Sequence, residues 1–98
     1  PSSYERVAVY KRLLSAESEA ELSELKEELQ DRYGCCPEVV TTLFKVALVR
    51  VRARRARLLR VALKGNRISL VAERGERTVE GGLDRLLEVL AIEQSRVK

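Results

Sequence analysis

The first 57 residues carry apolar side chains with the period of an α-helix. Apolar positions recur three or four residues apart, which is the spacing of the buried face of an amphipathic helix. Ser2 with Glu5, and Ser18 with Glu21, have the spacing of the capping boxes that open helices. Gly34 suits the end of a helix, because glycine readily takes the left-handed conformation found just beyond the last turn. The pattern predicts helices at about residues 3–15, 18–33 and 37–57.

Beyond residue 57 the apolar period changes from 3.6 to 2, which is typical of β-strands. Strands are predicted at about residues 58–63 and 67–72, and the Gly65-Asn66 pair between them suits the turn of a β-hairpin. Gly81-Gly82 then precedes a last helix at about residues 81–94. A hairpin alone is marginal in water, so it must pack on the helices or belong to a larger small sheet. The predicted fold class is α+β, with three N-terminal helices, a β-hairpin and a C-terminal helix.

The chain has 98 residues, which fits a single domain spanning residues 1–98. It begins with Pro1 rather than Met, so we expect a fragment of a longer protein. No apolar run approaches the roughly 18 residues of a membrane helix, and no membrane partner is expected. Cys35 and Cys36 are adjacent, where a mutual disulfide would be strained. We interpret them as reduced turn residues of a cytoplasmic protein, with redox control as the alternative.

The sequence offers little for catalysis. It contains no histidine, the usual base near neutral pH, and its two cysteines are too few for a zinc site. Gly81-Gly82 lacks the lysine and the third glycine of phosphate-binding loops. The carboxylates crowd one exposed helix face, where nothing sets the pKa of one apart from its neighbours. We therefore expect a domain that is not an enzyme and that holds no cofactor or metal of its own.

Charge divides the chain into two unlike halves. Residues 1–49 hold 9 acidic and 6 basic side chains, a balance of −3. Residues 50–98 hold 6 acidic and 13 basic side chains, a balance of +7. One half is therefore suited to a basic partner and the other to an acidic one.

The acidic side chains of the second predicted helix form one stripe. At 100° per residue, a sector of about 80° holds the apolar residues Leu22, Leu25, Leu29 and Tyr33. A second sector of about 80° holds what we call the acidic stripe: Glu17, Glu21, Glu24, Glu28 and Asp31. Like charges at these spacings destabilise a helix slightly, so the stripe is either a solvated face or a site for a partner's arginines. The docking interpretation selects Glu28 and Asp31 near the helix end, with Glu24 and Arg32 beside them.

Arginines gather at the end of the third predicted helix. Arg50, Arg54 and Arg57 would form one stripe on that helix, with Arg52 and Arg55 beside it and Arg60 following. The stripe could hold nucleic-acid phosphates, or it could be a solvated face favoured by the helix C-terminus. No aromatic residue is interleaved to stack on bases, which disfavours single-strand binding. A small basic nucleic-acid-binding module is therefore the alternative to protein docking.

Four segments give the chain a family resemblance. They read V-Y-K-R-L-L-S-A-E-S at residues 9–18, E-L-S-E-L-K-E-E-L at 21–29, D-R-Y-G at 31–34 and P-E at 37–38. Together they resemble the C-terminal regulatory domain of bacterial transcription-repair coupling factors. The similarity covers roughly residues 4–60 and is looser from Leu43 to Arg55. Arg57 stands where family members commonly have a glycine that ends a helix.

The resemblance implies a parent protein that is an ATP-dependent DNA translocase, with ATP and Mg bound in motor domains outside this chain. That parent displaces stalled RNA polymerase from damaged DNA and recruits the excision-repair damage-recognition protein. In the family, this last domain packs on an N-terminal excision-nuclease-like module, masks its repair-protein surface and restrains the motor. The resemblance places Glu28 and Asp31 opposite arginines of that module.

Overall fold

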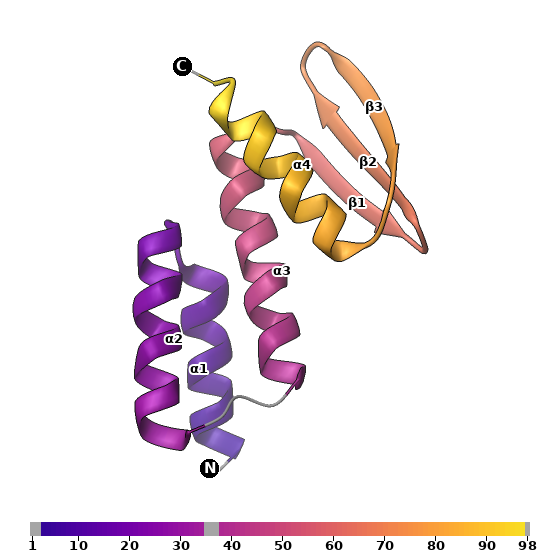
Figure 1. Ribbon diagram of the computed structural model, residues 1–98. Coiled ribbons are helices and arrows are strands. Elements are labelled where there is room, and N and C mark those ends of the chain that lie inside the picture. Colours follow the sequence, from indigo (N-terminus) through magenta and orange to yellow (C-terminus); the bar gives the residue numbers. More distant parts are fainter. Residues whose placement is uncertain (1–2, 35–37, 98) are drawn as a thin grey trace. The chain divides into compact units, whose positions relative to one another are not determined.

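Residues 3–34 and 38–97, which the structure describes, form four helices and one three-stranded sheet in a computed structural model (Figure 1). The elements are α1 (Ser3–Ser15), α2 (Glu19–Tyr33), α3 (Glu38–Arg55), β1 (Arg60–Lys64), β2 (Arg67–Ala72), β3 (Gly75–Glu80) and α4 (Leu83–Ser95). The predicted α+β class is confirmed. The chain divides into two compact units, Pro1–Val51 and Arg52–Lys98, with the division inside α3. The single-domain expectation stays a prediction.

The first unit is built from α1, α2 and most of α3, whose apolar faces share one core. Leu22, Leu25 and Leu29 are buried on α2, at the spacing predicted for its inner face. They pack with the remaining buried residues of this core, which are Leu13, Ala16, Ala47 and Val51. Removing these side chains from water is the main stabilising contribution to the unit.

Both ends of α2 use the predicted residues. Ser18 Oγ accepts a hydrogen bond from the Glu21 backbone N–H at 3.2 Å. The Glu21 carboxylate accepts a hydrogen bond from the Glu17 N–H at 3.3 Å. In a regular capping box it would accept from the N–H of the N-cap residue Ser18, one position later in the chain. Gly34, with φ of 76°, donates its N–H to Gln30 O at 2.8 Å and ends the helix. The predictions for Ser2, Cys35, Cys36 and Pro37 lie outside the described residues.

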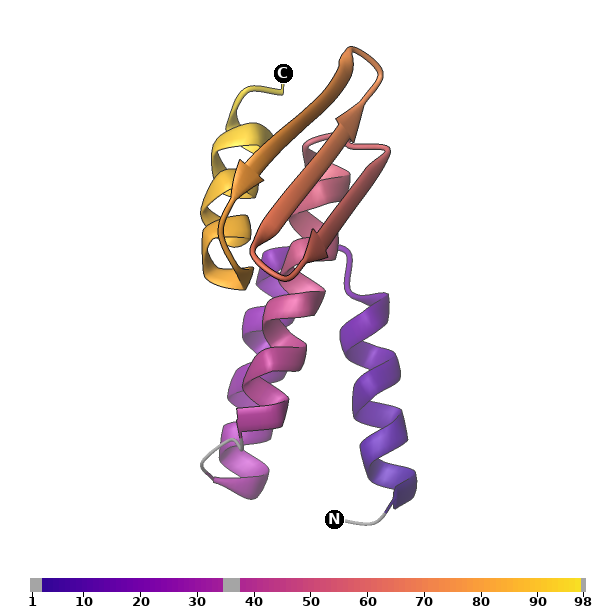
Figure 2. The same cartoon turned by 90° about the vertical axis from the view of Figure 1, so that its right-hand side faces the viewer.

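The second unit places α4 against one face of an antiparallel sheet with the order β1-β2-β3 (Figure 2). The predicted hairpin is present, with Lys64 opposite Arg67 at its turn. Ile68 and Leu70 lie two residues apart on β2 and are both buried, as are Leu86, Val89 and Leu90 on α4. The central strand and the last helix therefore supply most of this core.

The third strand, β3, is not among the strands that the sequence predicts, although the prediction allows for a larger sheet. In β3, Val79 is half-buried and the other residues, Gly75–Thr78 and Glu80, are exposed. Such a strand shows no apolar alternation, so the period-2 signal is missing. Antiparallel pairing with β2 holds β3 in the sheet, and in this register Ile68 lies opposite Val79 and Ala72 opposite Gly75.

Two predicted helix ends differ from the observed ones for backbone reasons. The last helix begins at Leu83 because Gly81 has φ of 146° and Gly82 is its N-cap. The third ends at Arg55 because Arg57 has φ of 60°. The Arg57 N–H donates to Arg54 O at 3.1 Å and the Leu58 N–H to Ala53 O at 3.0 Å. These two bonds form a Schellman motif, with arginine in the position usually held by glycine.

Candidate functional site

Four residues of the acidic stripe lie on the exposed side of α2, whereas Glu17 precedes the helix and its N-cap Ser18. Glu24, Glu28 and Asp31 are exposed, whereas the neighbouring leucines of the helix are at most 6% exposed. Arg32 is also exposed in the last turn of α2. Helical geometry therefore holds these carboxylates on a rigid element, with their backbone fixed by the core beneath.

A hollow of about 210 Å³ brings part of the stripe together within the first unit. Its lining residues are Arg12, Ala16, Glu21, Glu24, Leu25 and Glu28. Asp31 and Arg32 do not line it and lie farther towards the end of the helix. Three glutamates thus share one depression, whose apolar floor comes from Ala16 and Leu25, which are 3% and 4% exposed.

Arg12 of α1 forms an ion pair with Glu28. Its side chain is 55% exposed and that of Glu28 is 45% exposed, so water screens the pair. Arg12 is not among the predicted site residues, because the pair joins residues 16 positions apart on different helices. A helical wheel cannot show such a contact. Among the described side chains, no ion pair is found for Glu24 or Asp31.

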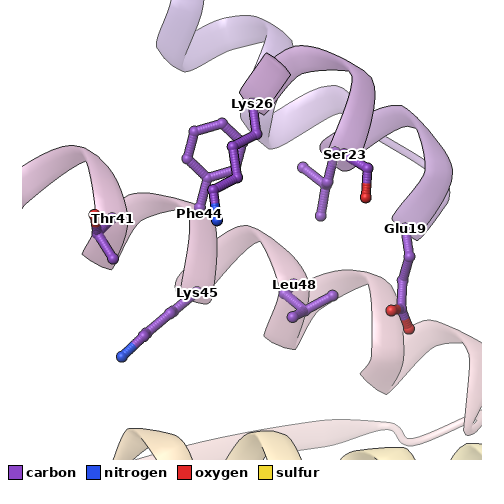
Figure 3. Close-up of a pocket in the computed structure, with 8 residues that line it drawn as sticks. Glu19, Ser23, Lys26, Thr41, Phe44, Lys45 and Leu48 are labelled. Carbon is purple, nitrogen blue, oxygen red and sulfur yellow. The ribbon is translucent and has the colours of Figure 1, made fainter. Parts of the chain in front are cut away.

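A second hollow, of about 250 Å³, lies between α2 and α3 on another side of α2 (Figure 3). Apolar side chains from both helices form part of it, Leu22 from α2 and Phe44 and Leu48 from α3. Its lining residues are Glu19, Leu22, Ser23, Lys26, Thr41, Phe44, Lys45 and Leu48.

The predicted arginine stripe is divided by its hydrogen bonds. Arg50 is half-buried and donates from Nη1 to Ala16 O at 2.9 Å. Arg52 donates from Nη1 to Leu87 O, also at 2.9 Å. Both guanidinium groups therefore stabilise the packing of their own units. Arg54, Arg55 and Arg57 are exposed and line a hollow of about 530 Å³ with Gln94, Ser95 and Val97.

Residues 3–34 and 38–97 contain no cluster of three or more His, Cys, Asp or Glu side chains placed to hold a metal ion. Within the same residues, no helix is both long enough and apolar enough to span a membrane.

Comparison with known proteins gives the chain a family. The model of the TRCF domain matches residues 1–80. The transcription-repair-coupling factor of Escherichia coli is 39% identical over 72 residues, which is 74% of this chain and 6% of that protein. The transcription-repair-coupling factor of Haemophilus influenzae is 46% identical over 46 residues, or 47% of this chain and 4% of that protein.

A solved structure agrees with these sequence matches. The crystal structure of the C-terminal domain of transcription-repair coupling factor superposes with a TM-score of 0.67 at 30% identity. The match covers 74% of this chain and 45% of the solved chain. The chain therefore belongs to the TRCF domain family, the C-terminal domain of transcription-repair coupling factors.

Proposed function

We propose that this domain is a non-catalytic regulatory latch within a transcription-coupled DNA repair factor. It docks intramolecularly on the N-terminal excision-nuclease-like module, masks that module's repair-protein surface and restrains the ATP-dependent DNA translocase. Membership of the TRCF domain family supports the setting. The acidic stripe on α2 supports the docking.

One observation carries the proposal: Glu24 and Glu28 are exposed, lie side by side in one hollow and stand on a helix anchored by its buried leucines. Clustered carboxylates on a rigid surface bind arginines well, because each guanidinium can bridge two oxygens. Asp31, one turn farther along α2, extends the same surface. An arginine-bearing partner would relieve the repulsion that the stripe experiences when it is alone.

The ion pair between Arg12 and Glu28 supports an arginine-binding role for this surface. Exposed pairs contribute only about 0.2–1 kcal/mol, so a docking arginine can share or replace Arg12 at little cost. A desolvated pair at a protein interface contributes more, since water no longer screens it. The surface is thus partly neutralised by its own domain and can still accept further positive charge.

The remaining activities belong to the proposed parent protein. ATP and Mg would bind in its motor domains, and its partners would be RNA polymerase, DNA and the excision-repair damage-recognition protein. A bacterial cytoplasmic location fits the bacterial relatives. This chain would act on all of these only through the module it covers.

The test is a double charge reversal, Glu28→Arg with Asp31→Arg, in the 98-residue chain. Calorimetric affinity for the separately produced N-terminal module should fall by about 2–5 kcal/mol, because a partner's arginines would then meet like charge. Both residues are exposed, so the far-ultraviolet spectrum and the thermal midpoint should change little.

The matched control is Glu73→Arg with Glu76→Arg, which makes the same change in charge at exposed positions of the second unit. It should leave the affinity for the module within about twofold, since long-range charge effects are screened by salt. Unchanged affinity in the Glu28/Asp31 variant would refute the proposed latch. Equal losses in both variants would refute its placement on α2.

A further inference from the structure

Arginines from three separate segments meet at one end of the second unit. Arg54 and Arg55 come from the last turn of α3, and Arg57 follows it; with Gln94, Ser95 and Val97 they line the hollow of about 530 Å³. A neighbouring hollow of about 650 Å³ includes Arg57 again, together with Arg74 of the β2–β3 turn and Arg96 after α4. We call these five residues the arginine end: Arg54, Arg55, Arg57, Arg74 and Arg96.

The two hollows differ in their acidic residues. The larger one includes Glu73 and Glu93. Glu93 already contacts Arg77 at 2.8 Å and Arg96 at 4.0 Å, so part of its charge is used within the unit. The smaller hollow has three arginines and no carboxylate among its lining residues. An anion is therefore attracted most strongly to the side formed by Arg54, Arg55 and Arg57.

Arg57 connects the two hollows and has a strained backbone. Its φ of 60° lies in the left-handed region, which disfavours residues with a Cβ. The Schellman bonds that end α3 are made by backbone atoms, so the guanidinium contributes nothing to them. A glycine would complete this helix end without the strain, whereas only arginine places a charge between the two hollows. Strain of this kind concentrates at ligand sites.

The chemistry of the arginine end suits phosphate groups spaced along a strand. Guanidinium groups bind phosphate oxygens through two parallel hydrogen bonds. Residues 52–98 contain no Phe, Tyr, Trp or His, so this unit offers no ring on which an unpaired base could stack. Arg74 and Arg96 extend the positive charge beside Arg54, Arg55 and Arg57 to two further segments. This arrangement matches a duplex backbone better than a single-stranded or mononucleotide ligand.

We propose that the arginine end binds the phosphodiester backbone of duplex DNA without sequence preference, contacting about three phosphates through Arg54, Arg55 and Arg57. This activity is distinct from docking through α2, which uses side chains of the opposite charge in the other unit. The two surfaces share no residue.

The test measures binding of the 98-residue chain to a mixed-sequence 20-base-pair duplex by fluorescence anisotropy between 50 and 200 mM salt. Release of counterions from three phosphates predicts a slope of about −2.7 in log affinity against log salt, or an affinity loss of about 40-fold over this range. Arg54→Gln and Arg57→Gly should each reduce the slope by about 0.9. The Arg57→Gly chain should also unfold at an equal or higher temperature, which separates a lost contact from a lost fold.

Arg67→Gln is the matched control. Arg67 is exposed at the β1–β2 turn, at the opposite end of the sheet from the β2–β3 turn that carries Arg74. Its replacement by glutamine removes one positive charge, as Arg54→Gln does. It should keep the slope of the unchanged chain. The proposal fails if no binding is detected at 50 mM salt, or if Arg67→Gln lowers the slope as much as Arg54→Gln does. It also fails if polyglutamate of equal charge competes as well as DNA, since an acidic protein would then be the better partner.

Discussion

At Arg57 the chain places a residue with a side chain in a conformation that favours glycine, with φ of 60°. A non-glycine residue in the left-handed region loses about 1–2 kcal/mol relative to the right-handed one. Glycine avoids this cost but loses more backbone entropy on folding, about 0.5–1 kcal/mol. Arg57→Gly should therefore raise the free energy of unfolding by about 0.5–1 kcal/mol, measured by urea denaturation.

Arg55→Gly provides the comparison, since Arg55 is the last residue of the α3 helix and is also exposed. There glycine relieves no strain and loosens the helix, so stability should fall by about 0.5–1 kcal/mol. If both glycine variants destabilise the chain, the left-handed conformation at Arg57 does not cost what its dihedral angle implies.

Residue-level prediction succeeded where one residue and its sequence neighbours determine the outcome. Ser18 caps α2 and Gly34 ends it, because both act on backbone groups within a few positions. The same reasoning could not reveal the contact from Arg12 to Glu28 or the bond from Arg50 to Ala16 O, since each joins different helices. The sequence therefore predicts the exposed face of α2 that carries Glu24, Glu28 and Asp31, but not its local counterion Arg12.

At the scale of single elements, the first turn of α4 depends on the glycine at position 81. Its φ is 146°, and a Cβ built there would lie 2.5 Å from Arg85 Cβ and 2.4 Å from Arg85 Cγ. Rotation of the side chain can move Arg85 Cγ, but Arg85 Cβ is fixed to the backbone and cannot move without shifting the helix. Gly81→Ala should therefore lower the free energy of unfolding by about 1–3 kcal/mol, and thermal denaturation of the variant measures this loss.

A substitution at the adjacent Gly82 distinguishes the effect of this clash from the general effect of replacing a glycine. It has φ of −96°, and a Cβ there would meet nothing within 4 Å. Gly82→Ala should cost less than about 1 kcal/mol, mostly because alanine is a poorer N-cap than glycine. Similar losses in the two variants would mean that α4 tolerates a Cβ at Gly81 by moving Arg85.

Elements with one buried face were predicted well, and those without it were not. The α2 helix and the β2 strand each have an apolar face that is almost completely buried, which produces a clear period in the sequence. In β3, Val79 is half-buried and the rest is exposed, so its pairing with β2 comes from backbone hydrogen bonds that leave no apolar pattern. Pairing of this kind depends on tertiary structure.

At the scale of the whole molecule, the buried residues separate into two groups that follow the two compact units. Leu25 is 4% exposed in the first group, and Leu90 is fully buried in the second. Truncating either to alanine removes apolar contacts and leaves a cavity, at a cost of about 2–5 kcal/mol. The two variants therefore test whether stability is shared along the chain or held within each unit.

If each unit holds its own stability, Leu90→Ala should lower the protection of amide hydrogens mainly in β2 and α4, and Leu25→Ala mainly in α1 and α2. Hydrogen exchange followed by mass spectrometry resolves these segments. Division of the chain within α3 favours this outcome, because each core gathers its side chains from one side of that division. Equal loss of protection in all four elements for both variants would contradict it and would support a single cooperative domain. With separable units, the proposed latch would keep its contact through α2 while the sheet and α4 open independently.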